Sequence, residues 1–304
     1  AAPERLTNGS VTVSVQASVY GAGNAVAQLK WANGVRAADD FAAAGSAIDP
    51  DRPAFQVSAN DTYTVFAEDR AGNKTVQTIA VSNISSVTPT ISLTPYPLAV
   101  TNGSVTVSVY ASVYGAGNAV ASARWTEGER DASFFAGGGG TELVPDSLQF
   151  AVVRSGTYTV YVRDMAGNAK VQSIGIANIV KAGPVIRLAA SPSSGGKVTV
   201  AVDASVHGEA AGNTVAVLKW AKGTRATDDF ADGGTVLAID SPSFEAYADD
   251  VYTVYAKDAA GNESVKTIDL RGVVPPGPGE DPDTGGPGVP GNPAGEGNPG
   301  GAGN

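Results

Sequence analysis

The sequence contains nearly the same pattern of residues three times, and this repetition constrains the fold more than any other feature. The spacing is 94 residues from Trp31 to Trp125 and 95 from Trp125 to Trp220. A period this long is a whole domain rather than a solenoid unit, so each copy should close its own core. We expect three tandem domains at residues 1–86, 87–181 and 182–273, followed by a tail at 274–304.

Within each copy the apolar residues alternate with polar ones, which is typical of half-buried β-strands. Val11, Val13 and Val15 form the first such run, and a second places Leu29 and Trp31 on one face. The tryptophan should therefore point inward. Later runs flank a hairpin turn, which recurs as Asp69–Asn73, Asp164–Asn168 and Asp258–Asn262.

These short strands describe an immunoglobulin-like β-sandwich, with an inward tryptophan and a corner tyrosine opening the penultimate strand. The predicted fold class is all-β, with three such sandwiches in an elongated array. The core signature residues are Trp31, Trp125, Trp220, Tyr63, Tyr158 and Tyr252.

The pattern of Val-Thr-Val, Gly-x-Gly-Asn, Lys/Arg-Trp and Tyr-Thr-Val-x-x-x-Asp-x-Ala-Gly-Asn resembles bacterial immunoglobulin-like repeats of Gram-positive cell-surface and secreted proteins. The resemblance covers roughly residues 1 to 272. It implies a sandwich module strung in tandem, often beside cell-surface anchors, adhesive tips or secreted polysaccharide-degrading enzymes. Because such a fold carries many functions, it does not decide between them.

The composition and charge of the chain exclude some classes of binding partner. The chain has no cysteine, and 20 basic residues face 30 acidic ones without a basic cluster. Nucleic acid is therefore a poor partner. No run approaches the ~20 apolar residues of a membrane span, so membrane insertion is not expected. We expect an extracellular protein, at the cell surface or secreted.

Catalysis has little to build on. The single histidine is His207, and no Ser-His-Asp arrangement recurs, so we predict no enzyme and no cofactor. The loop that holds His207 has Tyr20 and Tyr114 in the other copies, which favours a contact at a joint or interface.

Each hairpin turn offers one weak calcium site, because carboxylate and amide oxygens are hard ligands. Asp and Asn in tight turns more often satisfy the turn backbone, and a single carboxylate is too few for tight binding. We therefore predict no metal. The candidate residues are Asp69, Asn73, Asp164, Asn168, Asp258 and Asn262.

One position of the penultimate strand is aromatic in all copies and should face away from the core: Phe66, Tyr161 or Tyr255. Exposed aromatic side chains stack on sugar rings or form interfaces. The alternative is cross-strand packing on the outer sheet face.

The ends of the copies differ. The second and third copies open with an extra alternating run at 90–93 and 185–188, the expected strand A, and the first copy has no counterpart. One interpretation is a cut end of a longer protein. The other is an open edge filled by a strand from another subunit, which would link subunits into a fibre.

The tail places glycine in a three-residue frame, broken only at Ala294. It is either a Pro/Gly linker or a short collagen-like segment. The leading functional hypothesis is a non-catalytic stalk or filament segment that contacts other protein subunits or neighbouring domains. The alternatives are an adhesive or carbohydrate-binding module that recognises cell-wall or other polysaccharide, and an accessory region of a larger secreted polysaccharide-degrading enzyme.

Overall fold

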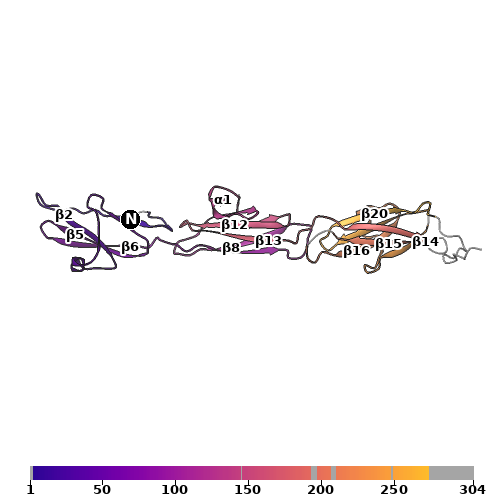
Figure 1. Ribbon diagram of the computed structural model, residues 1–304, viewed down its shortest axis with the longest axis horizontal. Coiled ribbons are helices and arrows are strands. Elements are labelled where there is room, and N and C mark those ends of the chain that lie inside the picture. Colours follow the sequence, from indigo (N-terminus) through magenta and orange to yellow (C-terminus); the bar gives the residue numbers. More distant parts are fainter. Residues whose placement is uncertain (1–2, 145, 193–196, 207–209, 248, 274–304) are drawn as a thin grey trace, which may run out of the picture. The chain divides into compact units, whose positions relative to one another are not determined.

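The computed structural model describes residues 3–273, apart from residues 145, 193–196, 207–209 and 248 (Figure 1). The chain is nearly all β, and pairs of antiparallel sheets form sandwiches as predicted. Residues up to Ala182 form one compact unit, and most residues from Gly183 onward form a second. The boundaries of the three copies stay a prediction, and the tail at 274–304 lies outside the described residues.

The first copy has a sheet of order β3-β2-β5-β6 and a second sheet of β1 and β4. A short 3-10 helix, η1, connects β2 to β3. The elements are β1 (Val11–Ser14), β2 (Val26–Asn33), η1 (Ala38–Ala42), β3 (Ser46–Ala47), β4 (Ala54–Val57), β5 (Asp61–Asp69) and β6 (Lys74–Val81).

The second copy has sheets of order β10-β9-β12-β13 and β11-β8-β7, and helix α1 takes the place of η1. The elements are β7 (Thr90–Tyr96), β8 (Val105–Ser112), β9 (Val120–Glu127), α1 (Ala132–Ala136), β10 (Thr141–Glu142), β11 (Gln149–Val152), β12 (Gly156–Asp164) and β13 (Ala169–Ile176).

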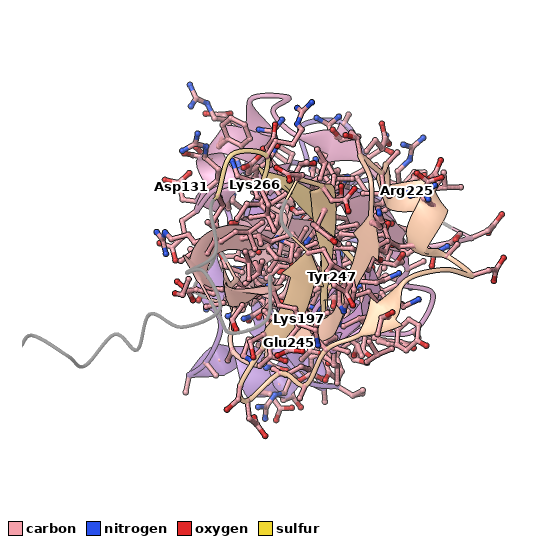
Figure 2. The ribbon with its side chains drawn as sticks, turned by 90° about the vertical axis from the view of Figure 1, so that its right-hand side faces the viewer. Asp131, Lys197, Arg225, Glu245, Tyr247 and Lys266 are labelled. Carbon is pink, nitrogen blue, oxygen red and sulfur yellow. The ribbon has the colours of Figure 1, made fainter. Side chains whose placement is uncertain are left out.

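The third copy has sheets of order β14-β15-β18 and β17-β16-β19-β20. Its exposed outer surface carries ion pairs such as Lys197 with Glu245 at 2.7 Å (Figure 2). The elements are β14 (Val185–Pro192), β15 (Lys197–Ser205), β16 (Val215–Lys222), η2 (Thr227–Phe230), β17 (Thr235–Val236), β18 (Ser243–Tyr247), β19 (Val251–Asp258) and β20 (Glu263–Asp269).

Among the described residues the predicted strand A is present in the second and third copies. In the second copy β7 pairs with β8, and in the third β14 pairs with β15. In the first copy β1 is the strand equivalent to β8 and β15, and among the described residues it pairs with β4 alone.

An aromatic trio joins the two sheets of every sandwich. In the first copy Trp31 of β2 stacks on Phe55 of β4 with ring centroids 4.6 Å apart, and Tyr63 tilts against Trp31 at 5.8 Å. The Tyr63 hydroxyl donates to the carbonyl of Ala59 at 2.7 Å, which satisfies its polar end inside the core. The corresponding tryptophan to phenylalanine distances are 4.3 Å for Trp125–Phe150 and 4.4 Å for Trp220–Phe244.

A second aromatic pair covers the opposite face of the four-stranded sheet. In the second copy Phe135 of α1 stacks on Tyr161 at 5.1 Å, and α1 lies over the face of this sheet (Figure 1). Tyr161 is 4% exposed, and its counterparts Phe66 and Tyr255 are 2% and 6% exposed. The expectation that these three side chains are exposed is wrong. The connection after the tryptophan strand folds back over them, because its own phenylalanine needs a partner to bury against.

Gly140 lies at the end of this connection, and a substitution there tests how closely α1 packs on the sheet. A Cβ at Gly140 would lie 2.8 Å from Phe135 Cε1 and 2.9 Å from the carbonyl of Trp125, at a φ of +79°. Gly128 of the same copy has a φ of +84° with nothing within 4 Å, so Gly128→Ala is a matched control. Both variants lose roughly 1 kcal/mol to the left-handed backbone. Gly140→Ala should lose about 1–3 kcal/mol more, because the helix must shift.

Native-state hydrogen exchange at the buried amides of Val160 and Val162 measures both losses within the second copy. Equal losses in the two variants would contradict the close packing of α1 on the sheet.

Candidate functional site

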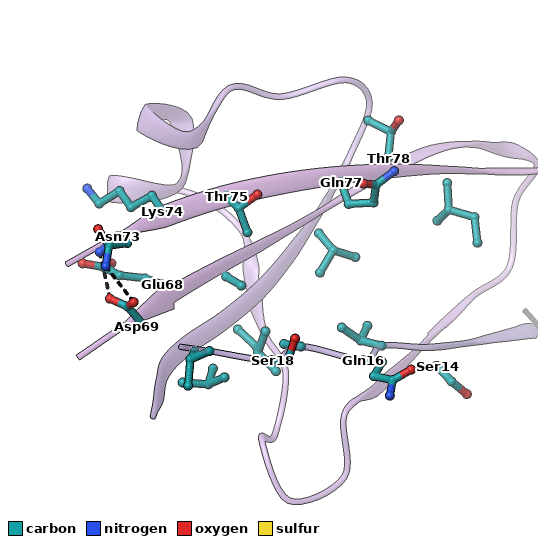
Figure 3. A pocket seen from close by; sticks show the side chains of 18 of the residues that line it. Ser14, Gln16, Ser18, Glu68, Asp69, Asn73, Lys74, Thr75, Gln77 and Thr78 are labelled. Atoms are coloured by element: carbon teal, nitrogen blue, oxygen red, sulfur yellow. Dashed lines mark hydrogen bonds between the residues drawn. The ribbon is translucent and has the colours of Figure 1, made fainter. Parts of the chain in front are cut away.

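In the described structure an open groove of about 750 Å³ runs along β1 of the first copy. One wall is β1 and its extension to Tyr20, and the other is formed by β5 and β6. Figure 3 shows Ser14, Gln16 and Ser18 along the first wall and Thr75, Gln77 and Thr78 along the other. The apolar residues among those that line the groove are Val13, Val15, Ala17, Val19, Val26, Leu29, Val65, Ala67 and Ile79.

The groove is an uncovered part of the core rather than a surface depression. Val160 and Val162 of the second copy are fully buried, whereas their counterparts Val65 and Ala67 are only half-buried. In the second copy Ile91 and Leu93 of β7 pack against the same core. Burying two such side chains contributes about 1.5–3 kcal/mol each.

The backbone of β1 is unpaired on the groove side in the described structure. Val15 donates its N–H to the carbonyl of Pro53 at 2.7 Å, in register with the pairs of β1 and β4. Successive residues of a strand point their N–H and C=O groups to opposite edges. Thr12, Ser14 and Gln16 therefore direct theirs toward the edge that β7 occupies in the second copy.

The hairpin turn at the end of the groove is held by its own side chains. The amide of Asn73 donates to Asp69 Oδ2 at 2.8 Å (Figure 3). The amide of Asn24 donates to the same oxygen at 2.9 Å, and the backbone N–H of Asn73 donates to Oδ1 at 2.9 Å. The Asn73 and Asn24 side-chain hydrogen bonds lower the pKa of the Asp69 carboxyl to about 2. These donors occupy the carboxylate that a calcium ion would need.

In the second copy Asp164 and Asn168 of the same turn are buried. Burial alone would raise the pKa of Asp164, but hydrogen bonds from Asn168 and Asn118 outweigh it and hold this pKa below its usual range. Across the described residues no group of three His, Cys, Asp or Glu side chains that could hold a metal ion is present.

Burial of this turn comes from the first copy. The Asn168 amide donates at 2.8 Å to the carbonyl of Ser85, which lies in the linker between β6 and β7, residues 82–89. The backbone N–H of Asn8 donates to the carbonyl of Ala166 at 2.9 Å. Ser85 Oγ in turn donates to the carbonyl of Tyr114 at 2.9 Å. Three hydrogen bonds thus join the first copy and its linker to the loops of the second.

The linker itself is fixed to the first copy. The Asn60 amide and carbonyl exchange hydrogen bonds with the backbone of Ile84 at 2.7 and 2.9 Å. Thr7 pairs with the backbone of Asn83 and Ser85 at 2.9 and 2.8 Å. The linker is therefore an ordered strand-like segment within this unit.

The loop residues predicted to lie at joints separate into different environments. Tyr114 is at the joint through its carbonyl, although its side chain remains 45% exposed. Tyr20 is 91% exposed at the rim of the groove. His207 lies outside the described residues. The sequence predicted a bare sheet edge in the first copy. It did not predict the depth of the groove, because the pattern of alternation does not place the side chains on which that depth depends.

No described helix is long and apolar enough to span a membrane. No known protein family and no curated protein matches the sequence.

Solved structures to which this chain is similar include the three N-terminal domains of the Highly Immunogenic Outer Capsid protein (Hoc) of bacteriophage RB49. That likeness has 10% identity and a TM-score of 0.37, and it covers 88% of this chain and 95% of the phage chain. A structure concerning host cell surface retention of a 1.5-MDa bacterial ice-binding adhesin has 16% identity and a TM-score of 0.35, and it covers 87% of this chain and 92% of that one.

The pKa of Asp69 tests the turn network. Its folded value of about 2 lies below the ordinary value near 3.9, so its contribution to stability is present above about pH 4 and is lost as pH falls through about 2. Asn24→Ala removes one donor and should raise this pKa. An NMR titration of the Asp69 carboxyl measures it directly.

Asn33→Ala, at the other end of β2, is the control and should leave the pKa of Asp69 unchanged. A wild-type value near 3.9 would contradict the network.

Proposed function

We propose that this chain is a non-catalytic extracellular structural protein, a stalk or filament segment of a bacterial surface. The observation that carries the proposal is the joint between the first two copies. A linker that is hydrogen-bonded on both sides holds two sandwiches in a defined arrangement, which a spacer requires and a flexible tether does not.

The polar side chains of the hairpin turn, which could suggest a catalytic or binding site, take part in the joint between the two copies. Asn168 donates its side-chain amide both to Asp164 within the turn and to the linker carbonyl of Ser85.

A carbohydrate-binding function loses its residue basis at Phe66, Tyr161 and Tyr255, since all three rings are covered. The resemblance to repeats of Gram-positive surface proteins implies that the bacterium is Gram-positive, and this is also part of the proposal.

The joint predicts a difference between two equivalent asparagines. Asn168→Ala removes a bond to Asp164 and the bond to the linker carbonyl of Ser85. Asn73→Ala removes the equivalent bond to Asp69, but its turn contacts no linker in the described structure. Loss of the buried linker bond should cost the joint about 1–3 kcal/mol.

Residual dipolar couplings of the first and second copies measure their relative order. Asn168→Ala should reduce the order between the copies, and Asn73→Ala should preserve it. A joint that is equally ordered in both variants would argue against a fixed spacer.

The location of the protein tests the proposal that it is extracellular. Antibodies raised against the chain should label intact cells that produce it, without permeabilisation. Labelling that appears only after permeabilisation would overturn the proposal, whatever the stiffness of the joint.

A further inference from the structure

We propose that the outer face of the three-stranded sheet of the second copy binds an extended, uncharged polysaccharide chain. The sheet has the order β11-β8-β7, and its inner face packs Ile91, Leu93 and Val107 against the core. Residues at the alternate positions of each strand point the other way. Two of them, Tyr96 of β7 and Tyr110 of β8, are 76% and 65% exposed.

The two tyrosine rings are uncovered because their cross-strand neighbours are small. Tyr110 faces Ser92 and Tyr96 faces Thr106 in the pairing of β7 with β8. Among the described residues neither tyrosine hydroxyl has a protein hydrogen-bond partner. Each ring therefore offers both an open aromatic face and a free hydroxyl group to a ligand.

The rest of this face offers hydroxyl and amide groups and carries no charge. The register of the three strands places ten residues on it. They are Thr90, Ser92, Thr94, Tyr96, Thr106, Ser108, Tyr110, Ser112, Gln149 and Ala151. A face without charge binds an uncharged ligand without leaving an ionic group desolvated and unpaired.

The other copies show that the sandwich does not require such a face. Where the second copy pairs Ser92 with Tyr110, the third has Arg187 and Asp203, which form an ion pair at 3.4 Å. The first copy has Gln16 in the place of Tyr110. The uncharged face with two tyrosines is therefore a property of the sequence of the second copy.

The chemistry of this face matches a sugar polymer. A pyranose ring has an apolar C–H face that stacks on an aromatic ring, and its hydroxyl groups bond to serine, threonine and glutamine. Tyr96 lies four residues beyond Ser92, the partner of Tyr110, so the two tyrosines are about 13 Å apart along the strand direction. That distance exceeds one sugar ring, so the ligand must be a chain of several units.

The shape of the sheet selects among such chains. An extended chain reaches both tyrosines at once, whereas a coiled chain turns away from the face after the first contact. β-linked hexose chains of the cellulose and chitin type are extended and uncharged. The inference goes beyond the proposed structural function, because it assigns a ligand to one copy and holds wherever the chain is located.

The probes are cellohexaose and chitohexaose, two uncharged β-linked hexasaccharides, titrated into the full chain and followed by NMR. The ring resonances of Tyr96 and Tyr110 should shift together as at least one probe binds. Binding of neither hexasaccharide, or shifts confined to other residues, would overturn the proposal. Maltohexaose is α-linked and should bind about tenfold or more weakly, and equal affinity for it would refute recognition of an extended chain.

Two variants test the tyrosines. Tyr96→Ala and Tyr110→Ala should each weaken binding roughly tenfold, because the ligand loses one stacked ring. Both side chains are exposed, so unchanged amide exchange at Val107 and Val109 should show that the second copy is still folded. Affinity that survives both changes would contradict the site.

Tyr247→Ala is the matched control. Tyr247 is 63% exposed on the corresponding sheet of the third copy, where Lys197 lies opposite it (Figure 2). Its loss should leave the affinity for both hexasaccharides unchanged. A loss of affinity equal to that of Tyr110→Ala would mean that any exposed tyrosine of this chain binds sugar and that the second copy has no built site.

Contact between two copies of the chain is the competing use of an exposed face. Sedimentation velocity of the wild-type chain and of Tyr110→Ala measures it. A chain that stays monomeric and binds a hexasaccharide supports the proposal. Self-association that Tyr110→Ala abolishes, without binding of either hexasaccharide, would overturn it and leave the proposed structural function standing.

Discussion

The stack of a tryptophan on a phenylalanine across the two sheets is the interaction on which the rest of this structure depends. It recurs in every copy at 4.3 to 4.6 Å, always with the corner tyrosine against it. Without cysteine, no disulfide can join the sheets, so the trio takes that place in the centre of the core. Aromatic pairs of this geometry contribute about 0.5–1.5 kcal/mol beyond the area they bury.

Because the trio lies away from strand A, the first copy can keep its sheets together with one edge open. Trp31, Phe55 and Tyr63 come from strands that the first copy retains. The uncovered part of the described core lies at one side, where Val65 and Ala67 are half-buried.

The strands and the turns could be predicted from the sequence, because alternation and the Asp-x-Ala-Gly-Asn pattern are local signals. The burial of Tyr161 could not. Alternation places its ring on the outer face, but only the path of the connection at 128–140 determines that Phe135 covers it. The contact of Asn168 with Ser85 was equally hidden, since the same residue type in the first copy has no such partner in the described structure.

The central claim is that the first copy is a folded but open sandwich, and amide hydrogen exchange of the free chain tests it most directly. The account predicts slow exchange at Val13 and Val15, which face β4, and fast exchange at Thr12, Ser14 and Gln16. In the second copy the amides of Thr106, Ser108 and Tyr110 should exchange slowly, because β7 covers them. Fast exchange throughout β1 would mean that the aromatic trio does not hold the first copy together, and uniform protection would mean that its edge is not open.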